Sequence, residues 1–302
     1  MGPGVDEEHF RLVTGFNDIF VVIACILLLV SVWWMGTELG AWFGPLLQTV
    51  AAWGLAEYFT RKRRMALPSI ILLIAFVVGV YATGEELLSG LGLKDKTGIA
   101  VISFVMALAA RLHWLRFKVP ITVAAGIASL VAGSISLLWV LVPAVQDWMT
   151  VAIFVSGVLV FMLAMRWDTS DILRHTRRSD VAFWLHLVAA PLLVHPVFTS
   201  LGVFEEQTAL WQLVVIAVLY GIVALVSISV DRRALMVSAL VYVLYAFSEI
   251  LEHYGVVSLS FAFTAFIIGS GLLLLSAFWH SCRAALIGRC PSSVQARLPP
   301  LR

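Results

Sequence analysis

Residues 177–198 read RRSDVAFWLHLVAAPLLVHPVF, an apolar stretch that is long enough to cross a bilayer yet carries two histidines and two prolines. His186 and His195 lie on opposite sides of Pro191, and Pro196 directly follows His195. Proline inside a helix removes a backbone hydrogen bond and crowds the preceding turn, so this stretch predicts a kinked or locally unwound membrane helix. Ionisable rings at membrane depth usually face protein or water rather than lipid. We therefore expect any working site of the chain to lie here.

The composition of the whole chain is typical of a membrane protein. Of its 302 residues, 61% are hydrophobic and only 13% are charged, and the mean hydropathy is +0.99. Soluble domains are about half apolar and about a quarter charged. The sequence contains no basic run mixed with exposed aromatic residues, so nothing in it indicates a nucleic-acid partner. We expect the lipid bilayer as the partner and an integral membrane location, in the inner (cytoplasmic) membrane if the source is bacterial.

About ten apolar segments of roughly 20 residues, the length that crosses a bilayer, follow one another along the chain. They are 16–36, 39–60, 65–84, 97–115, 120–142, 148–166, 181–203, 208–230, 234–254 and 257–280. Only the connectors 85–96 and 167–180 are long enough to hold extra structure. The pattern predicts an all-α polytopic protein with one transmembrane domain, 1–288, and a short cytoplasmic tail, 289–302.

The basic residues are divided unequally between the two ends of these segments. With ten spans, 18 of the 20 lysines and arginines fall on one side, and only Lys94 and Lys96 fall on the other. Short cytoplasmic loops carry an excess of Lys and Arg. Because a wrong helix count would have scrambled this bias, we predict about ten transmembrane helices with both the N- and the C-terminus in the cytoplasm.

Short motifs recur at matching places six segments apart. They pair 63–67 with 232–235, and 82–87 with 246–251. Because an even number of segments separates the copies, they would share their orientation in the membrane. The pattern suggests a parallel four-helix repeat of helices 1–4 and 7–10, residues 16–115 and 179–280. Several transporter folds contain internal repeats.

Two histidines and a carboxylate are expected at membrane depth. Counted from Asp180, His186 lies roughly 9 Å and His195 roughly 22 Å along the helix, and Glu249 lies roughly 24 Å along the segment that follows Arg233. His195 and Glu249 are thus expected at about the same level. A carboxylate near a histidine in a low dielectric suits proton relay or cation handling. The alternative is that His195 binds a carbonyl freed by the proline next to it.

Glu249, Glu252 and His253 are spaced three and four residues apart, so they lie on or beside one face of a helix. With His186 and His195 they are candidates for a substrate or proton pathway. The alternative is that Glu252 and His253 are hydrated residues at the membrane surface. The alternative for His186 is a buried hydrogen bond between helices.

The sequence predicts neither a metal site nor a cofactor. Nine residues apart on a regular helix, His186 and His195 point to nearly opposite faces, so they cannot share one metal unless the proline region rewinds the helix. Cys25, Cys282 and Cys290 show no pairing pattern or metal-binding spacing. Phosphate-binding glycine loops, His-Glu-x-x-His and the nucleophile elbow are missing from the sequence, so no catalytic residue can be assigned.

Two acidic residues mark expected helix entries. Asp18 and Asp180 each follow a residue suited to helix capping, where a carboxylate meets unpaired backbone N–H groups, and we interpret both as structural. Glu57 lies four residues before Arg61, and this spacing predicts a salt bridge on the surface of a helix.

Three functional classes stay open. The first is a secondary transporter or permease for a small molecule or a lipid-like compound, with its polar site around a proline-broken seventh helix. The second is a membrane-embedded enzyme acting on a lipid or polyprenyl substrate, with His195 as base. The third is a non-catalytic scaffold or assembly subunit. We favour the transporter, because compact helices, short loops and ionisable groups at depth are typical of that class.

Overall fold

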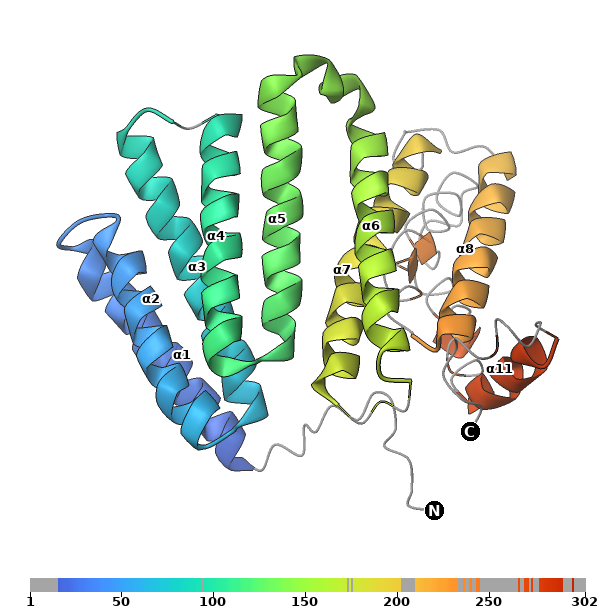
Figure 1. The fold of residues 1–302 in the computed structure, drawn as a ribbon, viewed down its shortest axis with the longest axis horizontal. Helices are drawn as coiled ribbons and strands as arrows, with labels where there is room; N and C mark the ends of the chain where they lie inside the picture. Colours follow the sequence, from blue (N-terminus) through green and yellow to red (C-terminus); the bar gives the residue numbers. More distant parts are fainter. Residues whose placement is uncertain are drawn as a thin grey trace. The chain divides into compact units, whose positions relative to one another are not determined.

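The computed structural model describes residues 16–93, 95–172, 174, 176–201, 210–232 and 277–289, and a few residues between and beyond the last two ranges. Every element in these ranges is a helix, as Figure 1 shows, and no strand occurs in them. The prediction of an all-α chain is confirmed.

Six of the described helices are long and apolar enough to cross a membrane. They are α1 (Phe16–Thr37), α3 (Ala66–Gly90), α4 (Lys96–Phe117), α5 (Pro120–Leu141), α6 (Met149–Thr169) and α7 (Arg177–Ser200). A seventh apolar helix, α8, covers Leu210–Val230. These helices support an integral membrane location. The number of ten spans and the cytoplasmic position of both termini stay predictions.

The chain divides into two compact units, Met1–Gln146 and Asp147–Arg302. The first contains α1, α2 (Phe43–Ala56), α3, α4 and α5, and the second contains α6, α7, α8 and α11 (Trp279–Ile287). The predicted transmembrane domain, 1–288, and its internal repeat stay predictions.

In the first unit, the connection between α4 and α5 is encoded locally. Asp95 caps α4, because its side chain accepts hydrogen bonds from the backbone N–H groups of Thr97 and Gly98 at 3.1 and 3.5 Å. α4 ends at Phe117; the next residue, Lys118, has a φ of 55°, and Pro120 then begins α5. Proline is well suited to this first position, where its missing N–H leaves no bond unmade. α4 and α5 pack against each other.

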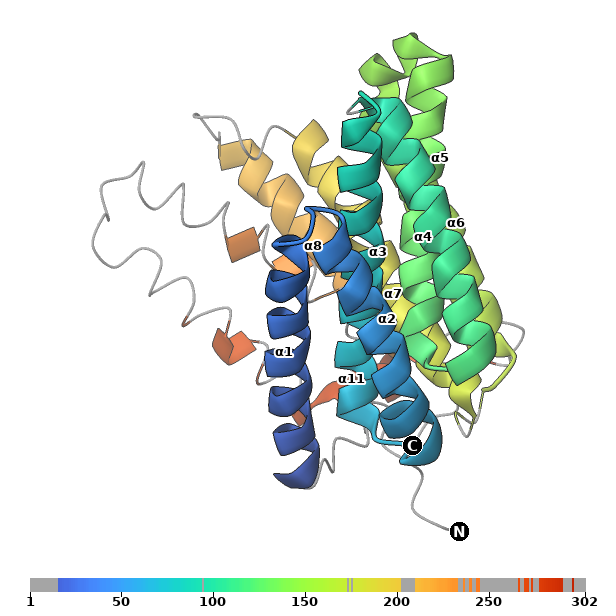
Figure 2. The same cartoon turned by 90° about the vertical axis from the view of Figure 1, so that its left-hand side faces the viewer.

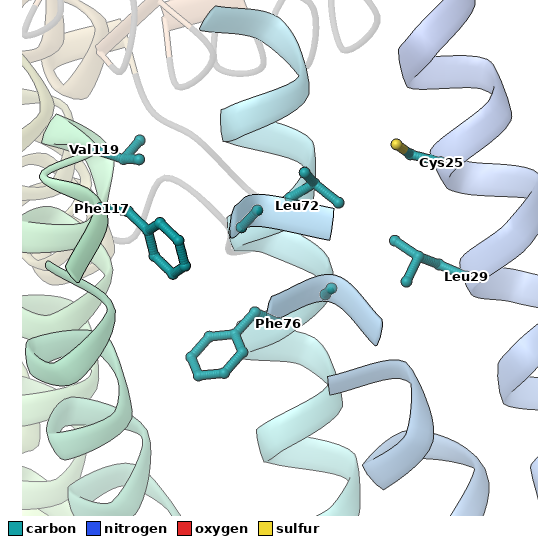
Figure 3. Packing of buried hydrophobic residues seen from close by; sticks show 8 residues of the cluster. Cys25, Leu29, Leu72, Phe76, Phe117 and Val119 are labelled. Carbon is teal, nitrogen blue, oxygen red and sulfur yellow. The ribbon is translucent and has the colours of Figure 1, made fainter. Parts of the chain in front are cut away.

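The core of the first unit lies between α1, α2, α3 and the end of α4. Figure 2 shows α1, α2 and α3 side by side. In Figure 3, Leu72 and Phe76 of α3 lie between Cys25 and Leu29 of α1 and the ring of Phe117. This apolar contact fixes the end of α4 beside the end of α2.

In the second unit, α6 and α7 pack so closely that glycine is required between them. A Cβ atom on Gly157 of α6 would lie 2.8 Å from the carbonyl carbon of Leu192 and 2.9 Å from the backbone nitrogen of Leu193, both on α7. Because these are backbone atoms, they cannot move aside as a flexible side chain would. Backbone therefore meets backbone at this crossing.

α7 is helical at every residue from Arg177 to Ser200, with Pro191 and Pro196 inside it. The prediction of local unwinding is therefore wrong, whereas a kink at the prolines stays a prediction. Proline is tolerated inside membrane helices where neighbouring helices and side chains compensate for the lost backbone bond. The close contact of α6 with α7 just beyond Pro191 supplies such a neighbour.

Candidate functional site

Three ionisable side chains meet in the interior of the second unit. Asp168 lies in the last turn of α6, His186 in the middle of α7, and Arg232 just after the end of α8. The exposed fraction is 0% for His186, 2% for Arg232 and 6% for Asp168. We call these three residues the Asp168 triad.

The carboxylate of Asp168 joins the triad. Nε2 of His186 donates to Oδ2 at 2.8 Å. Nε of Arg232 donates to the same oxygen at 3.3 Å, and Nη2 of Arg232 donates to Oδ1. Two parallel bonds from a guanidinium to a carboxylate are stronger and more directional than single contacts. Nη2 also reaches the carbonyl and hydroxyl oxygens of Ser179 at 3.3 and 3.2 Å.

Small residues on α7 bring the imidazole close to α6. His186 shares the buried face of α7 with Ala182, Ala189 and Ala190, each 0% exposed. These short side chains leave room for the ring beside α6, where the ring of Phe161 lies edge-on at a centroid distance of 5.3 Å. The face on which His186 lies therefore follows from local sequence, whereas its partner is supplied by another helix.

The end of α8 turns Arg232 inward. Asp231 has a φ of 60°, a left-handed conformation that aspartate tolerates better than most residues. The backbone N–H of Arg232 donates to the carbonyl of Ser227 at 2.9 Å, and the hydroxyl of Ser227 donates to the carbonyl of Arg232. This closed turn fixes the direction in which the guanidinium leaves the helix end.

A second buried carboxylate lies next to the triad in sequence. Oδ1 of Asp231 accepts a hydrogen bond from Nε1 of Trp279 at 2.7 Å. Its Oδ2 lies 3.5 Å from Nη1 of Arg174 and 3.6 Å from Nη1 of Arg283. Nη2 of Arg174 also donates to the carbonyl of Val230 at 3.2 Å. All four charged or aromatic side chains of this group are buried, and we call Asp231, Trp279, Arg174 and Arg283 the Asp231 group.

The Asp168 triad contains a ring nitrogen at which a proton can be gained or lost. Nδ1 of His186 is buried and has no hydrogen-bond partner among the residues that the structure describes. A proton can be added to or removed from Nδ1 while the bond from Nε2 to Asp168 stays in place. Burying a charge costs several kcal/mol per ion unless it is paired. Ionisable groups kept inside membrane proteins despite this cost commonly mark ion or substrate pathways.

The hydrogen bond from Trp279 predicts a measurable loss of stability. Trp279→Phe keeps an aromatic ring but removes the Nε1–H that Asp231 accepts. We expect the free energy of unfolding to fall by about 1.5–3 kcal/mol, the scale of a hydrogen bond to a charged group. The measurement is the melting temperature in detergent. Trp148→Phe, at a tryptophan of the same unit that is 67% exposed, is the control, and equal shifts in both variants would contradict the assignment.

Of the two predicted pathway residues that the structure describes, His186 lies in this site and His195 does not. His186 is buried in the triad, whereas His195 is exposed on α7, in agreement with their expected position on opposite faces. Glu249, Glu252 and His253 lie outside the described residues, so their part in the pathway stays a prediction.

The predicted helix entries and the predicted surface salt bridge can both be located. Asp18 and Asp180 lie in the first turns of α1 and α7, although the side chain that caps α7 is that of Thr176. Nη1 of Arg61 lies 3.3 Å from Glu57, so that salt bridge is confirmed. Glu57 also accepts two bonds from Arg116, at 2.6 and 3.0 Å, which the sequence did not predict.

Sequence reasoning missed most of the charged residues of the site. Asp168 fell in the expected connector 167–180, but α6 continues through it to Thr169. The arginines were interpreted as topology signals only. A usable signal was present: an acidic residue directly at the end of an apolar segment, as in Arg166-Trp167-Asp168 and Asp231-Arg232, is a candidate partner for a buried arginine.

Within the described part of the chain, no group of three or more His, Cys, Asp or Glu side chains is arranged to hold a metal ion. Comparison with known proteins gives no match to a family model, to a curated protein or to a solved structure. The geometry of the site is therefore the basis on which a function can be inferred.

Proposed function

We propose that this protein is a secondary transporter for a small molecule or a lipid-like compound, and that the Asp168 triad carries the proton that couples transport. One observation carries the proposal. The ring of His186 is 0% exposed, one of its nitrogens binds Asp168, and the other has no partner among the described residues. A buried histidine in this state is suited to taking up and releasing a proton.

The proton would act by changing what holds Arg232. A proton on Asp168 would cancel the negative charge that binds the guanidinium, whereas a proton on Nδ1 of His186 would strengthen the attraction between the ring and the carboxylate. Protonation thus selects between an arrangement with Arg232 bound to Asp168 and one with Arg232 available to a substrate. A modest difference in contacts is enough to shift such a two-state element.

A recurring arrangement in the two units supports the transporter class. The first unit contains a His-x-x-Arg sequence at 113–116, and the second contains two, at 175–178 and at 280–283. At 113–116 and at 280–283, the arginine pairs with an acid near the end of an earlier helix, Glu57 in the first unit and Asp231 in the second. This likeness favours the predicted internal repeat, and secondary transporters are commonly built from repeats.

We also propose that His195 and Glu249 form the outer part of the same pathway, followed by Glu252 and His253. The support for this extension is their common predicted depth and the spacing of the three acidic and basic residues along one helix face.

The test is proton flux into proteoliposomes that contain the purified protein and a pH-sensitive dye. Under an inward proton gradient, we expect at least one solute from a panel of organic anions, amines and lysolipids to raise proton entry. His186→Gln should lower this solute-dependent flux by roughly a factor of 100, the scale at which a positioned proton-transfer group contributes. His280→Gln, at an exposed histidine of the same unit, should leave it unchanged.

Three outcomes would count against the proposal. Equal flux in the wild type and His186→Gln would remove the triad from coupling. Unaltered flux after both His195→Ala and Glu249→Gln would remove the outer pathway. Absence of solute-dependent flux across the panel would remove the transporter itself.

One observation favours a second candidate, a non-catalytic assembly subunit. Both oxygens of Asp168 are already bound within the unit, and a network that is complete without a ligand is also what a purely structural role requires. This candidate predicts that one stoichiometric partner co-purifies equally with the wild type and with His186→Gln, and that no solute drives proton flux.

A further inference from the structure

One end of the first unit carries seven basic side chains, all of them exposed. They are Arg61, Lys62, Arg63, Arg64, Arg111, Arg116 and Lys118. We call this surface the basic rim. Its two segments, 57–64 and 111–118, contain a single acidic residue, Glu57. The rim shares no residue with the Asp168 triad or the Asp231 group, so a ligand bound to the rim does not depend on the proposed function.

The two segments of the rim are held side by side. Arg116 of α4 donates two hydrogen bonds to Glu57, which follows α2, at 2.6 and 3.0 Å. Next to this pair, the ring of Phe117 packs on the ring of Trp53 at a centroid distance of 5.0 Å. Figure 3 shows Phe117 and Val119 directed toward the core between the helices. The cations from both segments therefore share one surface.

The end of α2 concentrates the positive charge further. Residues Glu57–Lys62 form a π-helical turn, in which the N–H of Arg63 donates to the carbonyl of Tyr58 at 2.9 Å. Arg64 then takes a left-handed conformation with a φ of 55°. Four consecutive basic residues are thereby displayed on a compact helix end. Like charges this close repel one another, so an opposing anion would stabilise this arrangement.

The carboxylate of Glu57 cannot neutralise all of the positive charge of the basic rim. Glu57 is shared by Arg61 and Arg116. Within the described part of the chain, no carboxylate pairs with Lys62, Arg64 or Arg111. As far as the described residues show, these three side chains are available to an external anion.

Aromatic rings lie beside the cations of the rim, an arrangement typical of the depth of lipid headgroups. Nε and Nη2 of Arg63 both donate to the hydroxyl of Tyr58 at 3.3 Å, and its guanidinium lies 5.6 Å from the centre of the ring. Nζ of Lys118 lies 5.2 Å from the centre of the Trp114 ring. Tyrosine and tryptophan are enriched at the membrane–water interface, where their rings meet both apolar chains and polar headgroups.

We infer that the basic rim binds the phosphate groups of anionic phospholipids at the membrane surface. The guanidinium groups present paired N–H donors whose geometry matches phosphate oxygens, and the neighbouring lysines add charge without directional demands. Clusters of basic residues immediately beside a membrane helix bind anionic lipid headgroups in this way. The lipid would stay attached to the first unit and stabilise the end that carries the rim.

The test measures lipid retained on the full-length, detergent-solubilised protein by native mass spectrometry. Phosphatidylglycerol and phosphatidylcholine of matched chain length are the probes. We expect the wild type to retain phosphatidylglycerol in preference to phosphatidylcholine. Lys62→Gln/Arg64→Gln should weaken retention of phosphatidylglycerol by about fivefold for each charge removed. Arg177→Gln/Arg178→Gln, at an exposed basic pair of the second unit, is the control with the same change of charge and should retain the lipid as the wild type does.

The outcomes separate the rim from general charge effects and from free phosphate. Equal retention of both lipids by the wild type, or equal losses in the two double variants, would overturn the inference. Displacement of the lipid by excess inorganic phosphate would also overturn it, because the surface would then be a phosphate site. The double variant Lys62→Arg/Arg64→Lys keeps both charges and should retain phosphatidylglycerol as the wild type does. Weak retention by this variant, in a protein with an unchanged elution profile, would likewise contradict a headgroup site.

Discussion

Asp168→Asn is expected to lower the free energy of unfolding by about 3–5 kcal/mol, the usual cost of breaking a buried ion pair by removing one partner. The change is nearly isosteric, so packing at the end of α6 is kept. What is lost is the negative charge between Arg232 and His186, whose side chains are 2% and 0% exposed. Arg232 would then be left as a buried cation whose direct carboxylate partner is gone. The measurement is denaturant or thermal unfolding in detergent.

A second variant separates this charge effect from general damage. Asp168→Asn/Arg232→Gln removes both charges, so no uncompensated ion stays buried, and we expect it to recover much of the stability that Asp168→Asn loses. Glu57→Gln is the control, because Glu57 also pairs with an arginine but is partly in contact with solvent, where ion pairs contribute little. A loss for Asp168→Asn no larger than that for Glu57→Gln would mean that the triad is not a tightly coupled buried pair.

Gly157→Leu is expected to separate α6 from α7 and thereby to dismantle the site. Even the Cβ atom of a new side chain would lie 2.8 and 2.9 Å from backbone atoms of Leu192 and Leu193. Overpacking of this kind costs about 1–3 kcal/mol and occasionally more. Moving α6 away from α7 also lengthens the 2.8 Å bond between Asp168 and His186. We therefore expect both a lower melting temperature and loss of any function that depends on the triad.

A graded pair of alanine variants controls for the change of residue type. Gly157→Ala should already destabilise the protein, because its Cβ meets backbone. Gly221→Ala, on α8 of the same unit, meets no atom of the described residues within 4 Å. It should leave stability unchanged or raise it slightly, since alanine favours a helix over glycine by about 1 kcal/mol. Destabilisation of the same size in both variants would contradict the close crossing of α6 and α7.

The helices of this protein could be predicted because their signal is local. The apolar segment expected at 97–115 is α4, Lys96–Phe117, and the one expected at 181–203 is α7, Arg177–Ser200. Length and hydropathy within each stretch are enough for such predictions, because a membrane helix satisfies its backbone hydrogen bonds internally. His186 could be chosen for a similar reason, since an ionisable ring inside an apolar stretch is visible without knowing its neighbours.

The effect of the two prolines on α7 could not be predicted from their own segment. Pro191 and Pro196 predict a kink or local unwinding when their segment is considered alone. In the folded unit the same segment is a continuous helix against α6, and the nearby Gly157 allows backbone to contact backbone. The outcome depended on a residue in another helix, more than 30 positions away in the sequence.

The amino-acid sequence by itself determined an all-helical chain rich in membrane-spanning segments, with a buried histidine as its most unusual polar group. Only the tertiary structure decided which charges meet that histidine. Asp168 is 18 residues from His186 and 64 residues from Arg232, and the three come together only because α6, α7 and the end of α8 pack in one unit. Hydropathy is a property of a single segment, whereas an ion pair between helices needs residues from two segments. Whether it forms depends on which helix faces are in contact.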